Sequence, residues 1–302
     1  MKRILSLSLI GSFLLAANGI AASDVKKFKE RSFDGYSYFA FGIENFRYSE
    51  KFIYTFNYSY ISPYSGKHYI AGDQIAVKSK INVSSPVYLS GSLIRLNDKF
   101  DLSMDFASTL KPNTTTEKWL DRGDDSVITK NYATIMSNSM KFLLHYKLTN
   151  EHRVTAGFSY ILNVFKRFND PDAGTTTLVE ETSATATLDV GYWFESNTAG
   201  QKGLRVKYEL TAGIPFYQDV QNTAAPGIKF TKASGFNLDT SIYGGYAVYQ
   251  NENGGVEVGA FASYSYMYRD GDSKEYNGQK VIWPTNITQA LRGGIQVSWK
   301  FN

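Results

Sequence analysis

The sequence contains no cysteine, so no disulfide contributes to its stability. Histidine is also scarce, with three residues in a chain of 302. Chemistry that needs an imidazole as general base, or as the group that orients one, therefore has few candidate positions. The fold has to be stabilised by packing and by its own backbone hydrogen bonds.

Charge imbalance and long apolar runs are missing as well. Beyond the N-terminal residues, no stretch reaches the roughly 18 apolar residues that a membrane-spanning helix needs. Without Lys2 and Arg3, which belong to the leader described next, 30 basic residues remain of 32 against 28 acidic residues, a net charge of +2. This balance excludes the electrostatic footprint of a nucleic-acid-binding protein.

The N-terminus has the pattern of a secretory signal peptide. Lys2 and Arg3 form a positive segment, Ile4 to Ala16 an apolar one, and Gly19 to Ala22 a small-residue cleavage site. We therefore predict a signal peptide over residues 1–22, a periplasmic lead-in over 23–35 and one folded domain over 36–302.

Aromatic residues and a period of two are what the rest of the chain has in abundance, with 22 tyrosines and 20 phenylalanines. The pattern is clearest from Gln289 to Asn302, where apolar residues alternate with polar or charged ones. Such alternation predicts a strand with one apolar face. The apolar set is Leu291, Gly293, Ile295, Val297, Trp299 and Phe301, and the intervening set is Arg292, Gly294, Gln296, Ser298 and Lys300.

This closing strand resembles the C-terminal signal of Gram-negative outer-membrane β-barrel proteins, an amphipathic strand that ends on phenylalanine. The chain departs from that pattern by one residue, Asn302. The resemblance implies export to the cell outer membrane, recognition of this strand by the barrel-assembly machinery, and its pairing with the first strand.

The alternation repeats in hairpins along the chain, as expected for a transmembrane barrel. Their tight turns are predicted near 97–99, 149–152, 196–203 and 251–254. In the first hairpin the apolar faces are predicted to be Val87, Leu89, Gly91 and Leu93 on one arm and Phe100, Leu102, Met104 and Phe106 on the other.

The turns alternate with longer polar connections, roughly 49–80, 108–130, 166–176, 218–234 and 269–285. Short periplasmic turns and long extracellular loops are usual in outer-membrane barrels. We predict an all-β, antiparallel up-and-down barrel of ten strands, with 51–81 extending the first hairpin. The alternative places two further membrane strands in 51–81 and gives twelve.

The residues between the apolar ones should line the lumen, and both charge signs occur among them. Ten strands lie nearer to the eight that side chains fill than to the sixteen that leave a channel. We predict a lumen occupied by ion pairs, with a narrow polar path for small solutes as the alternative. The lining candidates are Glu44, Asp101, Asp105, Lys141, His145, Asp189, Arg205, Lys207, Glu209, Glu257, Arg292 and Lys300.

Aromatic residues near strand ends suit the membrane interfaces, where amphipathic rings lie at headgroup level. The predicted interface residues are Tyr146, Tyr192, Tyr264, Tyr266, Trp299 and Phe301. The loop residues Trp119 and Trp283 leave a carbohydrate-stacking role open.

No catalytic, cofactor or metal site is predicted. The chain resembles ten-stranded omptin-type proteases in strand number only, because no aspartate and histidine constellation occurs near the extracellular rim. We predict a monomeric, non-enzymatic surface protein, structural or interacting through its long loops, in contact with outer-membrane lipid and lipopolysaccharide. The alternatives are a narrow channel and an outer-membrane hydrolase.

Overall fold

The computed structural model describes residues 35–169, 177–196, 203–251, 254–276 and 278–301. The predicted signal peptide, the lead-in up to residue 34, parts of four predicted connections and Asn302 lie outside these ranges.

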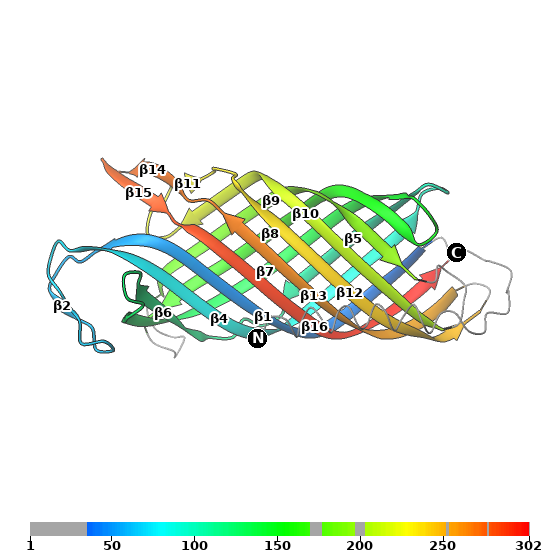
Figure 1. Ribbon diagram of the computed structural model, residues 1–302, viewed down its shortest axis with the longest axis horizontal. Helices are drawn as coiled ribbons and strands as arrows, with labels where there is room; N and C mark the ends of the chain where they lie inside the picture. The colour runs from blue at the N-terminus through cyan, green and yellow to red at the C-terminus, as the bar shows by residue number, and fades with distance from the viewer. Residues whose placement is uncertain (1–34, 170–176, 197–202, 252–253, 277, 302) are drawn as a thin grey trace.

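Ten antiparallel strands of the described chain form a closed ring (Figure 1). The ring closes because β1 pairs with β16 on one side and with β4 on the other. This confirms both the predicted strand number and the predicted pairing of the last strand with the first. The ring strands are β1 (Gly35–Thr55), β4 (Gln74–Arg95), β5 (Phe100–Thr109), β7 (Val127–Lys147), β8 (His152–Phe168), β9 (Thr177–Glu195), β10 (Leu204–Asn222), β12 (Gly235–Gln250), β13 (Gly254–Arg269) and β16 (Thr285–Phe301).

Shorter strands extend the wall or the loops. β6 (Thr115–Asp121) continues the wall beyond β5, because it pairs with the same neighbours, β4 and β7. β11 (Lys229–Phe230) adds to β10. β2 (Tyr60–Ile61) pairs with β3 (His68–Tyr69) at the tip of the first hairpin, and β14 (Asp272–Tyr276) pairs with β15 (Gln279–Trp283).

The two ends of the barrel differ. Both strand termini, Gly35 and Phe301, and the four tight connections lie at one end, which we call the short-turn end. The other, the long-loop end, carries the longer connections. In outer-membrane barrels, short turns usually lie on the periplasmic side and long loops on the extracellular side.

The prediction that 51–81 extends the first hairpin is confirmed, although the predicted connection 49–80 begins too early. β1 continues to Thr55 and β4 starts at Gln74, so residues 51–55 and 74–81 lengthen the first hairpin, and the twelve-strand alternative is wrong. The tip of the β1–β4 hairpin is packed by an aromatic cluster, in which Phe56 and Tyr69 stack with their ring centroids 4.5 Å apart. The alternation persists beyond any membrane because the inner face of this extension is itself buried.

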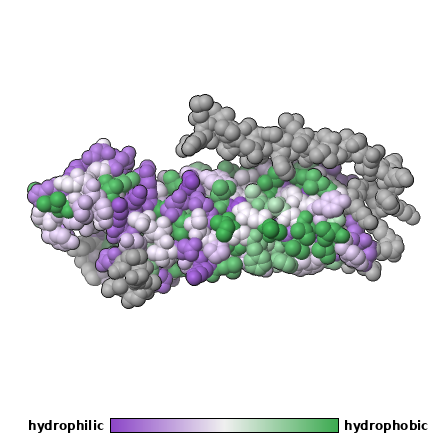
Figure 2. Space-filling model, turned by 90° about the horizontal axis from the view of Figure 1, so that it is seen from below, coloured by the Kyte–Doolittle hydropathy of each residue, from purple (hydrophilic) through white to green (hydrophobic). Residues whose placement is uncertain are grey.

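The outer surface carries an apolar belt in the half nearer the short turns, whereas the long-loop half is mostly hydrophilic (Figure 2). On β13, ten residues separate Val256, which pairs with Trp299, from Tyr266. A tilted strand needs about 9–11 residues to cross the hydrocarbon core, so the belt has the height of a membrane. The strands, 16 to 22 residues long apart from β5, rise well beyond it.

One predicted face is reversed. Val87 and Leu93 are 1% and 6% exposed and point into the barrel, so the predicted apolar face of this arm is its inner face. On the outside, β4 presents Tyr88, Ser90 and Ser92 opposite Phe41, Phe39 and Ser37. An apolar side chain on an alternating strand predicts a lipid-facing position, whereas on β4 Leu93 packs inside against Tyr36 and Trp193 and Leu89 lines the cavity.

Candidate functional site

The lumen near the short-turn end is crossed by an unbroken chain of ion pairs. Its members alternate in sign and come from seven strands, and all their side chains are at most 9% exposed. The chain runs Lys147–Asp101 (2.7 Å), Asp101–Arg153 (2.8 Å), Arg153–Glu195 (3.6 Å), Glu195–Arg205 (2.7 Å), Arg205–Glu257 (2.8 Å) and Glu257–Lys300 (3.6 Å). Buried charges persist only when they are paired, and here each charged side chain has a partner of opposite sign.

Aromatic rings hold a further buried amine in the same region. The Lys207 amine lies 4.1 Å from the ring centre of Tyr36 and 4.7 Å from that of Tyr243. Such contacts stabilise a desolvated cation. The ion-pair chain and its aromatic partners therefore form one connected layer.

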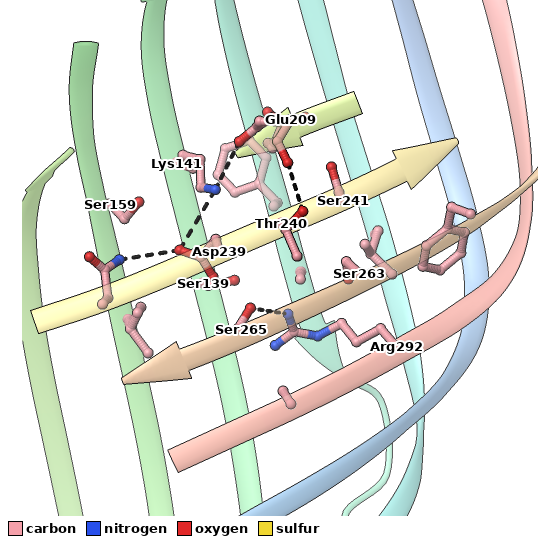
Figure 3. A pocket seen from close by; sticks show the side chains of 18 of the residues that line it. Ser139, Lys141, Ser159, Glu209, Asp239, Thr240, Ser241, Ser263, Ser265 and Arg292 are labelled. Atoms are coloured by element: carbon pink, nitrogen blue, oxygen red, sulfur yellow. Dashed lines mark hydrogen bonds and ion pairs between the residues drawn. The ribbon is translucent and has the colours of Figure 1, made fainter. Parts of the chain in front are cut away.

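Above this layer lies a cavity of about 180 Å³, lined by apolar as well as polar side chains, which we call the polar chamber after the charged groups within it (Figure 3). The Lys141 amine lies 3.0 Å from Glu209 and 3.8 Å from Asp239. Serine side chains, including Ser139 and Ser241, line part of the remaining wall, and apolar side chains such as Leu89 and Phe261 line the rest. A cavity of this size has room for several water molecules or one small polar solute, because a water needs only about 10–15 Å³.

Two further contacts complete the chamber. Arg292 donates to Glu44 at 2.6 Å and to Ser265 at 3.1 Å, which joins β16 to β1 and β13. Tyr38 donates to Asp105 at 2.6 Å. Each of these charged groups thus has a hydrogen-bond or ion-pair partner inside the barrel.

An apolar layer borders the chamber on its long-loop side. Phe46 and Ala290 line the cavity and belong to a cluster of buried residues from five strands. Tyr48 and Phe165 stack within it, with ring centroids 5.7 Å apart. An ion entering this layer would lose its hydration without gaining a partner, which is costly. The cluster is Phe46, Tyr48, Ile81, Val83, Ala133, Ile135, Phe165 and Ala290.

A second ion-pair group follows, beyond the membrane belt. Arg167 donates to both oxygens of Glu117 at 2.6 and 2.7 Å and to Glu50 at 3.0 Å. Burial raises the pKa of Glu50 to about 7, against the opposing charge of Arg167. Burial also acts to raise the pKa of Glu117, but Arg167 and Ser79 outweigh it, so this pKa lies below its ordinary value.

Every predicted lumen residue lies inside the ring. Asp105 and Lys141 are half-buried, and the others are at most 9% exposed. The structure joins Asp101, Arg205, Glu257 and Lys300 through the ion-pair chain, and Lys141 to Glu209. Asp189 instead accepts hydrogen bonds from Ser159 and Thr187.

The predicted interface aromatics lie on the outer face at two levels. Tyr146, Tyr192, Trp299 and Phe301 are near the short-turn end, whereas Tyr264 and Tyr266 are at the far side of the belt. Trp283 is 1% exposed and Arg269 lies against its ring. The suggested carbohydrate-stacking role of Trp283 is therefore wrong. Trp119 packs in the inner aromatic cluster with Arg167 over its ring.

Within the described residues, none of the three histidines has a carboxylate as hydrogen-bond partner, whereas a catalytic base oriented by a carboxylate would have one. His68 bonds Ser59 (2.7 Å) in the hairpin tip and His152 bonds Tyr192 on the outer face. His145 contacts Ser103 (2.8 Å), a pairing of base and hydroxyl, but they are 0% and 1% exposed. A substrate has no access to that pair.

Sequence reasoning missed several lumen residues. Arg153 and Glu195 occupy inward positions on β8 and β9, so the same alternation that found Asp189 would have found them. Glu50, Glu117 and Arg167 were assigned to loops. The inward apolar residues gave no signal, because an apolar side chain on an alternating strand is assigned to the lipid face by default.

Comparison with solved structures finds the same architecture. The chain is similar to the outer membrane protease OmpT of Escherichia coli, with a TM-score of 0.60 and 9% identity over 93% of this chain and 100% of that chain. Weaker likenesses include the translocator domain of the autotransporter NalP of Neisseria meningitidis (TM-score 0.34, 10% identity, 98% and 96% covered) and OprG of Pseudomonas aeruginosa (0.28, 11%, 90% and 98%).

No protein-family model matches the chain, and no curated protein matches it in sequence. The ring, its apolar belt and the likeness to OmpT show the fold of an outer-membrane-type β-barrel, the architecture that the sequence predicted. At 9% identity the likeness establishes the fold alone.

Proposed function

We propose that the protein is a non-enzymatic surface protein of the outer membrane, in which a closed barrel supports the long-loop end as an interaction surface. The observation that supports this proposal is the series of buried side-chain groups along the lumen. An ion-pair layer, an apolar layer and a second ion-pair group lie in series along it. A solute would have to break buried ion pairs and cross an apolar constriction.

The long-loop end offers apolar side chains to a partner. The tip of the β1–β4 hairpin exposes Tyr58 (69%), Ile61 (63%), Tyr64 (48%) and Ile70 (58%). Lys67 fixes this tip to the β6–β7 connection, with its amine 2.6 Å from Asp121 and 2.9 Å from Asp124. Exposed aromatic residues on a rigid support are typical of contact surfaces.

Conductance measurements in planar bilayers test whether the barrel is closed. Purified protein is expected to insert without producing stepwise currents. Sustained stepwise currents would instead favour the narrow channel, for which the polar chamber would be the central section. The matched variant is Phe46→Ala with Phe165→Ala, which removes the two aromatic rings of the apolar layer and should increase any residual leak.

The surface role and the hydrolase alternative need a separate test. Cells that display the wild type are compared with cells that display Tyr58→Ser, Ile61→Ser and Tyr64→Ser together, for adhesion to surfaces and for phage adsorption. The variant should lose adhesion or adsorption while keeping its surface level. Hydrolysis of peptide, lipid or acyl substrates by the wild type, lost in His68→Ala, would overturn the proposal.

A further inference from the structure

The outer face beyond the apolar belt carries a cluster of basic side chains on neighbouring strands. Three pairs of lysines are direct cross-strand partners: Lys51 with Lys78, Lys80 with Lys118, and Lys118 with Lys130. Arg47 lies beside them on β1. We call Arg47, Lys51, Lys78, Lys80, Lys118 and Lys130 the lysine ladder; all are exposed except Lys78, which is half-buried.

Like charges directly opposite one another destabilise a sheet. Within the described chain, no carboxylate forms an ion pair with a member of the ladder, and the Lys130 amine lies over the Tyr64 ring at 4.3 Å. Elsewhere on the outer face bases do have acidic partners, as in Lys166–Glu180 (3.1 Å) and Lys229–Asp219 (3.2 Å). The repulsion in the ladder is therefore left for an external anion to relieve.

The height of the ladder above the membrane limits what that anion can be. Arg47 and Lys51 lie four and eight residues beyond Ile43, an exposed residue of the apolar belt. At about 3.3 Å per residue and a tilt of about 40°, these steps are roughly 10 and 20 Å. A phospholipid headgroup layer is only about 5–8 Å thick, so the upper lysines lie beyond it.

We propose that the lysine ladder is a binding surface for the phosphate groups of an outer-leaflet glycolipid, lipopolysaccharide, whose acyl chains lie against the apolar belt. A phosphorylated saccharide headgroup reaches the required height, and several phosphates match several ammonium groups. The surface spans β1, β4, β6 and β7, so bound glycolipid would join the two arms of the first hairpin to the next one. The proposal holds whether or not the lumen conducts.

The test measures binding of lipopolysaccharide of defined composition to the full protein in zwitterionic detergent, by native mass spectrometry or thermophoresis. Each lysine near an anionic surface contributes about a fivefold change in affinity. Lys80→Gln, Lys118→Gln and Lys130→Gln together should weaken binding by roughly a hundredfold. The matched control, Lys166→Gln with Lys229→Gln, should change it by about twofold or less.

Heat-modifiable migration verifies that each variant is folded, and if the triple variant is not, Lys118→Gln alone should weaken binding about fivefold. Three results would overturn the proposal. One is equal affinity for dephosphorylated lipopolysaccharide. The second is equal binding of nanodiscs that contain phosphatidylglycerol, which would assign the ladder to phospholipid. The third is equal binding of polyglutamate, which would favour an acidic protein.

Discussion

The inner and outer faces of the same strands treat charge in opposite ways. On β6, Glu117 points inward and is held by Arg167 and Ser79, whereas its neighbour Lys118 points outward between two other lysines. Inside, an unpaired charge has no solvent and has to find a partner. Outside, water and bound ions screen the repulsion, so unfavourable pairs can be kept for a ligand.

The largest expected effect comes from breaking the inner side. Glu117→Gln leaves the buried Arg167 with Glu50 as its remaining carboxylate, which should cost about 3–5 kcal/mol of unfolding free energy. Denaturant titration of the detergent-solubilised barrel measures this. The adjacent Lys118→Gln is the control and should change stability by less than about 0.5 kcal/mol. Equal effects of the two substitutions would contradict the contrast between the faces.

The same group predicts a dependence on pH. Because the folded pKa of Glu50 is raised to about 7 from 4.5, the folded state binds more protons in that range. The unfolding free energy should therefore fall as pH rises from 4.5 to 7, by about 3 kcal/mol for this group. Glu50→Gln removes the effect, so the variant should gain stability relative to the wild type at pH 8 but not at pH 4. Thermal unfolding of both proteins at pH 4 and pH 8 measures this. A stability difference that is the same at the two pH values would contradict the raised pKa of Glu50.

Two neighbouring glycines of β16, one on each face, differ in the room that they leave for a side chain. A methyl group on Gly294 would lie 2.1 Å from the Phe41 carbonyl oxygen, whereas on Gly293 its nearest contact would be at 3.6 Å. Gly294→Ala should therefore weaken the seam between β16 and β1, by about 1–3 kcal/mol. Gly293→Ala should be close to neutral. The temperature at which the folded gel band disappears distinguishes them, and a neutral Gly294→Ala would show that the seam can relax.

The smallest effect is expected on the outer side. Lys118→Glu replaces two like-charge pairs with opposite ones and should stabilise the barrel by about 0.2–1 kcal/mol at low salt. The gain should fade at 1 M salt, where charges are screened within about 3 Å. Denaturant midpoints at the two salt concentrations measure it. Stability that falls instead would mean that Lys118 has a favourable contact within the protein.

Many of the lumen residues could be predicted from the alternation of inward and outward side chains along each strand. Alternation places Asp101, Arg205 and Glu257 inside because each is flanked by outward apolar residues. The rule fails where apolar residues face inward. Phe46 and Phe165 build the apolar layer, and Val87 and Leu93 reverse the face of β4, because the interior of a narrow barrel is dry enough to accept either kind of side chain.

The sequence by itself determined the class of fold, the number of strands and the closing role of β16, because a period of two and the spacing of turns are local properties of the chain. Only the tertiary structure decided which charges meet. The ion-pair chain and the lysine ladder each join side chains from several strands, and the curvature and register of the closed ring bring those together. Cross-strand register depends on all ten strands at once, so no single stretch encodes it.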